Sequence, residues 1–140
     1  PLTAKVFANS KTQRVVYVSG SKLSTKREKL LAAKNIEVLK VKTLKSGFDL
    51  KQLMKLLAQK DFNSILIEGG GEINSSAFAA KIVDRIFAFI SPILVGGQQA
   101  PTPIGGKGVD KIAKAINLKN MKVVQIGKDL MVEAEPCSAE

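Results

Sequence analysis

The sequence contains no histidine, and this absence removes several classes of chemistry together. Ser-His-Asp triads, imidazole general bases and imidazole metal ligands are all excluded. Cys137 is the only cysteine, so neither an internal disulfide nor a zinc cluster is expected, and a reducing cytoplasm is the expected location. No run of 18 apolar residues and no signal-peptide pattern occurs, so we expect no membrane partner. Any reaction must use carboxylates, lysines, hydroxyls, backbone groups or a borrowed cofactor.

Positive charge is concentrated in one half of the chain. Residues 1–60 hold 14 Lys or Arg against three acids, whereas residues 61–140 hold 8 against 9. A basic half can attract phosphates or nucleic acid. Tryptophan is absent, and Tyr17 and six phenylalanines supply no stacking platform among the lysines. We therefore expect no nucleic-acid partner and keep a basic nucleic-acid-binding module as an alternative.

Hydrophobic periodicity predicts an α/β three-layer sandwich, with a mostly parallel central sheet and antiparallel C-terminal strands. The predicted strands are 14–19, 36–41, 64–67, 84–90 with a continuation over 93–95, 121–126 and 130–134. The predicted helices are 23–34, 49–59, 71–81 and a short one within 109–116. Thr25 with Glu28, and Asp49 with Gln52, have the spacing of capping boxes. The third long helix is expected to bury Ile73, Ala77 and Ala80.

A glycine-rich turn between the predicted strand 64–67 and the predicted helix 71–81 is the main candidate site. Glu68 ends the strand and is followed by Gly69, Gly70 and Gly71. A helix N-terminus offers unpaired N–H groups, and glycines allow a phosphate to approach the backbone. The spacing fits neither the Rossmann fingerprint nor a Walker loop, so it indicates an anion without naming a nucleotide. A plain tight turn, with Glu68 as a capping or paired acid, is the alternative interpretation.

Further polar and glycine residues could lie beside that turn. Asn74, Ser75 and Ser76 offer side-chain hydrogen bonds at the same helix end, although such residues are common in a first turn. Asp84 is interpreted as a cap or turn acid. The long loop 96–108 carries Gly105-Gly106-Lys107-Gly108, which we interpret as a solvated surface loop. The residues assign no catalytic group and no metal site.

Several motifs together resemble one enzyme family. These are Leu2-Thr3-Ala4-Lys5-Val6-Phe7, Ser64-Ile65-Leu66-Ile67-Glu68-Gly69-Gly70, Val83-Asp84-Arg85 and Ser91-Pro92-Ile93-Leu94-Val95-Gly96-Gly97. They are similar to the reductase domain of the bifunctional deaminase–reductase of riboflavin biosynthesis, which has a dihydrofolate-reductase-like fold. The resemblance covers nearly the whole chain.

The resemblance implies a reaction, a cofactor and site residues. It implies an NADPH-dependent oxidoreductase that reduces the ribosyl group of 5-amino-6-(5-phosphoribosylamino)uracil to a ribityl group. Glu68 is then expected to contact the pyrimidine substrate. The residues expected to line the NADPH phosphates are Gly70, Gly71, Glu72, Ile73, Asn74, Ser75 and Ser76.

The resemblance also implies that the chain is one reductase-type domain, 1–140, without its N-terminal part. Family members usually carry a further strand, a Thr-x-Asp-Gly segment and basic residues before the position of Pro1, and often a zinc deaminase domain before those. We therefore expect a multifunctional parent enzyme, a homodimer, and a fragment that is itself inactive. Another reductase of the same fold with a different substrate, and an inert stable fragment, are the remaining alternatives.

Overall fold

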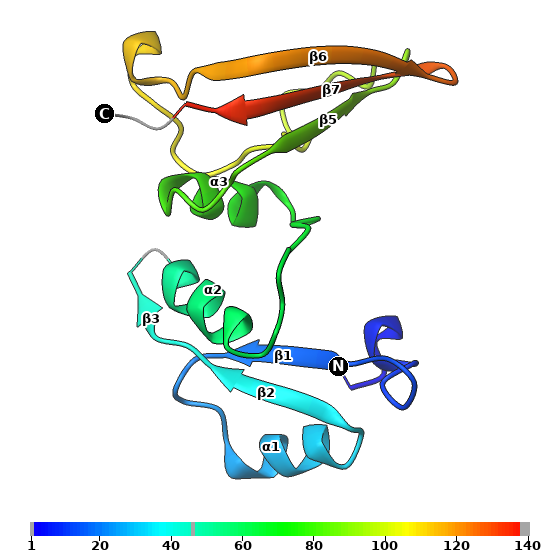
Figure 1. Ribbon diagram of the computed structural model, residues 1–140, viewed down its shortest axis with the longest axis vertical. Coiled ribbons are helices and arrows are strands. Elements are labelled where there is room, and N and C mark those ends of the chain that lie inside the picture. Colours follow the sequence, from blue (N-terminus) through cyan, green and yellow to red (C-terminus); the bar gives the residue numbers. More distant parts are fainter. Residues whose placement is uncertain (1, 46, 138–140) are drawn as a thin grey trace. The chain divides into compact units, whose positions relative to one another are not determined.

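The computed structural model describes residues 2–45 and 47–137. The chain divides into two compact units, Pro1–Ile65 and Leu66–Glu140. Each unit has its own sheet (Figure 1).

The first unit is built on a parallel pair of strands. β1 (Val15–Ser19) pairs with β2 (Ile36–Lys40), and α1 (Thr25–Ala32) connects them. The strand pair lies between α1 and α2 (Leu50–Ala58) in Figure 1, but it has two strands and is not the predicted mostly parallel central sheet. The short 3-10 helix η1 (Lys5–Phe7) and the hairpin of β3 (Thr43–Leu44) and β4 (Gly47–Phe48) were not predicted. The buried apolar side chains of this unit are Leu31, Ile36, Leu39, Val41 and Leu50.

The capping residue of α1 differs from the predicted one. Ser24 Oγ accepts a hydrogen bond from Arg27 N at 3.4 Å, so the cap lies one residue before Thr25. Glu28 forms an ion pair with Lys40 on the neighbouring strand. A salt bridge to β2 has therefore replaced the local capping box that the Thr25–Glu28 spacing predicted.

The cap of α2 agrees with the prediction in its first half. Asp49 Oδ1 accepts from Gln52 N at 3.0 Å. The Gln52 side chain does not reach back to the cap, because its Oε1 accepts from Lys42 N at 2.7 Å. That bond ties α2 to the segment following β2.

The second unit combines one helix with an antiparallel sheet. α3 (Gly71–Ala79) precedes β5 (Ile86–Ile90), the 3-10 helix η2 (Ile112–Lys114), β6 (Leu118–Ile126) and β7 (Asp129–Pro136). The strand order is β5-β7-β6, and α3 lies on one side of the sheet (Figure 1). The predicted C-terminal hairpin is confirmed, although Asp129 pairs with Ile126 and leaves a two-residue turn.

Two predicted strands are absent from the described residues. Residues 62–70 and 91–95 form neither helix nor strand, so the predictions over 64–67 and 93–95 are wrong. Leu66 is 74% exposed, and Leu94 is fully exposed. A strand exists only where a neighbour completes its hydrogen bonds, and apolarity alone supplies no neighbour. Parallel pairing in the described residues is consequently limited to β1 and β2, and the larger sheet is antiparallel.

Two smaller predictions also need correction. Only Ile112–Lys114 of the predicted helix in 109–116 is helical, as a 3-10 turn. Within α3, Ala77 is buried as predicted, but Ile73 is 40% exposed. The Ile73 side chain lies against the glycine turn, because a Cβ placed on Gly69 would meet Ile73 Cγ2 at 1.5 Å.

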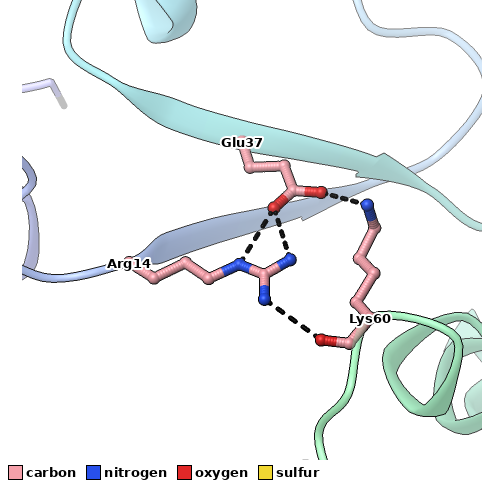
Figure 2. Close-up of polar contacts among 3 residues, drawn as sticks. All are labelled: Arg14, Glu37 and Lys60. Carbon is pink, nitrogen blue, oxygen red and sulfur yellow. Dashed lines mark hydrogen bonds and ion pairs between the residues drawn. The ribbon is translucent and has the colours of Figure 1, made fainter.

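An ion-pair cluster joins three segments of the first unit (Figure 2). Arg14 donates from Nε and Nη2 to Glu37 Oε2, at 3.3 and 3.1 Å, and from Nη1 to the Lys60 carbonyl at 3.1 Å. Lys60 Nζ pairs with Glu37 Oε1. The hydrogen bond from Lys60, assisted by Arg14, lowers the pKa of Glu37 below its ordinary value despite partial burial. The chain before β1, β2 itself and the end of α2 are thereby held together.

We predict that Glu37→Gln destabilises the protein in a pH-dependent way. A carboxyl with a lowered folded-state pKa adds stability above its unfolded-state pKa and loses it as pH falls through the folded-state pKa. The loss at neutral pH should be about 1 kcal/mol or less, because the ion pair is partly exposed. Urea unfolding of wild type and variant should therefore converge as pH falls below ~4.3, the usual glutamate pKa.

A double-mutant cycle with Lys60→Met is the control for this prediction. The loss of unfolding free energy in the double variant should be smaller than the sum of the two single losses, because each substitution removes the same contact. A destabilisation that stays constant from neutral to acidic pH would contradict the assignment.

Candidate functional site

The start of α3 leaves backbone donors without partners. Gly70 is the N-cap residue and has no side chain that could accept a hydrogen bond. Its carbonyl accepts from Ile73 N at 3.0 Å and Asn74 N at 3.2 Å. In the described part of the chain, no acceptor pairs with the N–H groups of Gly70, Gly71 or Glu72. These donors, at the positive end of the helix dipole, form an arrangement suited to an anion.

Gly69 and Gly70 differ in what a side chain would meet at their positions. Gly69 is needed for packing, since a Cβ there would collide with the Ile73 side chain. A Cβ on Gly70 would meet no atom within 4 Å. The φ of Gly70 is −68°, which any residue adopts, so neither backbone strain nor packing requires glycine at this position. The space at the Cβ position of Gly70 is therefore open, whereas the loop backbone at Thr102 and Gly105 lies against Gly71.

The other predicted site residues have distinct surroundings. Glu68 is exposed and forms no hydrogen bond within residues 2–45 and 47–137. Glu72 Oε1 accepts from Gly106 N at 3.0 Å, and Asn74 Nδ2 donates to the Pro103 carbonyl at 2.8 Å. Ser76 Oγ donates to the Glu72 carbonyl at 2.9 Å. The predicted run therefore offers backbone donors, while three of its side chains are already bonded within the protein.

Sequence reasoning missed that loop 102–106 lies against α3. The loop was interpreted as a solvated surface segment, but Gly105 N donates to the Gly71 carbonyl at 2.9 Å. A Cβ on Gly71 would lie 2.8 Å from Gly105 N. The adjacent pair Gly105-Gly106 was the available signal, because paired glycines permit close approach of backbone to backbone.

A second feature, in the first unit, was also missed. A hollow of about 600 Å³ lies beyond the carboxyl ends of β1 and β2. Its lining residues are Ser21, Lys22, Lys40, Val41, Lys42 and Thr43. Lys22, Lys42 and two hydroxyl groups favour an anionic ligand, while Lys40 is paired with Glu28. The carboxyl ends of parallel strands are where open α/β sheets bind ligands. Lys22 and Lys42, which follow the two predicted strands within three residues, were the signal in the sequence.

The donor sets exclude some ligands and suit others. In the described residues, no group of three or more His, Cys, Asp and Glu side chains could hold a metal ion. No helix in this part of the chain is long and apolar enough to cross a bilayer. Unpaired amides at a helix start suit the phosphates of a dinucleotide, which need backbone donors and close approach. This part of the chain therefore fits a nucleotide cofactor.

Comparison with known proteins identifies the family. Residues 1–132 match the family described as RibD C-terminal domain. The chain is 35% identical over 133 residues to the riboflavin biosynthesis protein RibD of Actinobacillus pleuropneumoniae, covering 95% of this chain and 35% of that protein. It is 29% identical over 135 residues to a 2,5-diamino-6-ribosylamino-4(3H)-pyrimidinone 5′-phosphate reductase of Aquifex aeolicus, covering 96% of this chain and 59% of that protein. The chain thus spans about a third of the RibD protein and more than half of the reductase.

Solved structures agree on the fold. Acinetobacter baumannii RibD, form 2, superimposes with a TM-score of 0.77 at 24% identity, over 98% of this chain and 34% of that chain. The riboflavin biosynthesis reductase Rib7 of Saccharomyces cerevisiae gives a TM-score of 0.62 at 16% identity, over 89% of this chain and 70% of that chain. At these identities the likeness establishes the dihydrofolate-reductase-like α/β fold alone. Together with the match over residues 1–132, it shows that the chain belongs to the RibD C-terminal domain family.

Proposed function

We propose that this chain is the reductase part of a riboflavin-biosynthesis enzyme. The reaction is the NADPH-dependent reduction of the ribosyl group of 5-amino-6-(5-phosphoribosylamino)uracil to a ribityl group. The observation that carries the proposal is the set of backbone donors without partners at the start of α3, next to a Gly70 whose Cβ position is open. Family membership gives those donors a candidate ligand, the phosphates of NADPH.

The protein's own contribution is binding and orientation. The chemistry that NADPH supplies when bound is hydride transfer, which requires no histidine from the protein. The amides of Gly70, Gly71 and Glu72 hold phosphate oxygens, and Glu68 binds the pyrimidine. A carboxylate can accept hydrogen bonds from the N–H and amino groups of a pyrimidine. The exposure of Glu68 and its freedom from internal hydrogen bonds support this role.

The lysine-lined hollow of the first unit supports a phosphorylated ligand. Lys22 and Lys42 provide cations, and Ser21 and Thr43 provide hydroxyl donors, while Lys40 is paired with Glu28. A phosphate monoester matches this set, and both NADPH and a phosphoribosylamino-pyrimidine carry one. The hollow therefore favours a phosphorylated ligand over an unphosphorylated one.

We further propose that the parent protein is larger than this chain. The RibD relatives are about three times as long, which leaves room for a fused deaminase domain. Residues 1–140 then belong to one reductase domain that functions as a homodimer in the cytoplasm. The single cysteine, suited to a reducing compartment, supports that location.

The amino-uracil has one specific competitor as substrate. The Aquifex aeolicus relative is called a 2,5-diamino-6-ribosylamino-4(3H)-pyrimidinone 5′-phosphate reductase. The two pyrimidines differ at the ring position that a deaminase would change. An enzyme fused to a deaminase would reduce the product of deamination, so we favour the uracil.

The proposed function predicts a defined selectivity in steady-state assays of the full-length protein. NADPH oxidation should require a phosphoribosylamino-pyrimidine, and dihydrofolate should not replace it. NADPH should exceed NADH by roughly tenfold or more in kcat/KM, since a phosphate–lysine contact is charge-assisted. The kcat/KM for the amino-uracil substrate should exceed the kcat/KM for the diamino-pyrimidinone. Oxidation with dihydrofolate alone would assign the chain to another reductase of this fold, and no oxidation with any substrate would refute the proposal.

Glu68→Gln should weaken the reaction without unfolding the protein. Hydrogen bonds to a charged group contribute about 1.5–3 kcal/mol, so kcat/KM for the pyrimidine should fall roughly 10- to 100-fold. Asp84→Asn is the matched control, because it neutralises another exposed acid of the same unit. Equal activity of wild type and Glu68→Gln would remove Glu68 from the substrate site.

Gly70→Val should block NADPH while leaving the fold intact. The new side chain would meet no protein atom near its Cβ, so only the cap preference is lost, about 1 kcal/mol. NADPH should then no longer raise the melting temperature, which a bound ligand otherwise does. Gly69→Val, which would collide with Ile73, should destabilise the protein even without NADPH. An unchanged NADPH affinity in Gly70→Val would show that the turn does not bind the cofactor.

A further inference from the structure

Loop 102–106 is fastened to the first turns of α3 by three hydrogen bonds. Gly105 N donates to the Gly71 carbonyl at 2.9 Å, and Gly106 N donates to Glu72 Oε1 at 3.0 Å. In the third bond the helix is the donor, because Asn74 Nδ2 donates to the Pro103 carbonyl at 2.8 Å. Two of these three bonds use side chains of α3, and those side chains belong to the run predicted to touch the cofactor.

The contact is too close to accept side chains at the glycines. A Cβ on Gly105 would lie 2.8 Å from Glu72 Oε1, and a Cβ on Gly106 would lie 2.3 Å from Ser75 Oγ. Gly106 also has a φ of +74°, which L side chains rarely adopt. The loop backbone therefore lies directly on the helix start, beside the amides that have no partner.

The charge of Glu72 is inconsistent with direct contact to a phosphate. A carboxylate in the first turn of a helix is favourable for the helix dipole, but it would repel an anion bound to the same turn. Its Oε1 accepts the Gly106 N–H, which directs that oxygen toward the loop. Backbone amides can then bind the ligand while the acid performs a different task.

We propose that Glu72 is a positioning residue, which anchors Gly105-Gly106 on the first turn of α3 and thereby fixes the free amides for the dinucleotide phosphates. This inference rests on the proposed function, and it replaces the direct cofactor contact that the sequence predicted for Glu72. Asn74 anchors the same loop through its hydrogen bond to the Pro103 carbonyl. The loop is thus a fixed wall of the cofactor site rather than a free surface segment.

The test compares Glu72→Ala with Glu72→Gln in the full-length protein. Glutamine keeps an oxygen that can accept the Gly106 N–H, whereas alanine does not. In Glu72→Ala without ligand, amide hydrogens of residues 104–106 should exchange about tenfold faster, the equivalent of one lost hydrogen bond. KM for NADPH should rise several-fold with kcat little changed, and Glu72→Gln should restore both properties. Asp110→Ala removes an exposed acid paired with Lys114 and should change neither property.

Three outcomes would decide against the proposal or against its premise. Unchanged exchange in Glu72→Ala would overturn the anchor. An equal rise of KM in Glu72→Ala and Glu72→Gln, with the loop still protected in Glu72→Gln, would show that the charge acts on the ligand directly. If wild type binds no NADPH, the proposed function fails, whereas the exchange data still decide whether Glu72 anchors the loop.

Discussion

The unsatisfied first turn of α3 is the constraint on which the functional interpretation depends. The first N–H groups of a helix have no acceptor within the helix, and side chains, water or ligands bind them. Ser24 caps α1 and Asp49 caps α2, and each of these side chains accepts one backbone N–H. α3 follows Gly70, which has no side chain to act as a cap, and the Cβ position of Gly70 is open. The one long helix of the described chain without a side-chain cap is thus the one that follows the glycine turn, which is the condition an anion site requires.

The backbone and the side chains at the start of α3 make different contacts. The first amides of α3 have no acceptor in the described part of the chain, while Glu72 and Asn74 form hydrogen bonds with the neighbouring loop. Glycines at the contact allow the loop backbone to reach the helix without displacing it. A site made of backbone donors tolerates changes of side chain as long as the turn and its wall remain rigid. Positioning by such a scaffold is what a cofactor-dependent reductase must supply, since the cofactor carries the reaction.

Local signals in the sequence were only partly correct. Asp49 caps α2 as predicted, whereas the cap of α1 is Ser24 and not the predicted Thr25. The strand predicted over 64–67 was wrong because pairing depends on a neighbour, and apolar content does not reveal one. The glycine turn is followed by a helix as predicted, but the hydrogen bonds of Glu72 and Asn74 to the loop were not predicted.

The sequence by itself determined the family, the absence of histidine chemistry and the position of the glycine turn ahead of a helix. Each of these depends on residue identity or on spacing along the chain. Only the tertiary structure decided that Gly70 borders open space, that Glu72 binds Gly106 N, and that lysines gather beyond β1 and β2. Those facts depend on contacts between segments some 20 to 34 residues apart in the sequence. Periodicity and propensity cannot predict such contacts, because they describe neighbours along the chain.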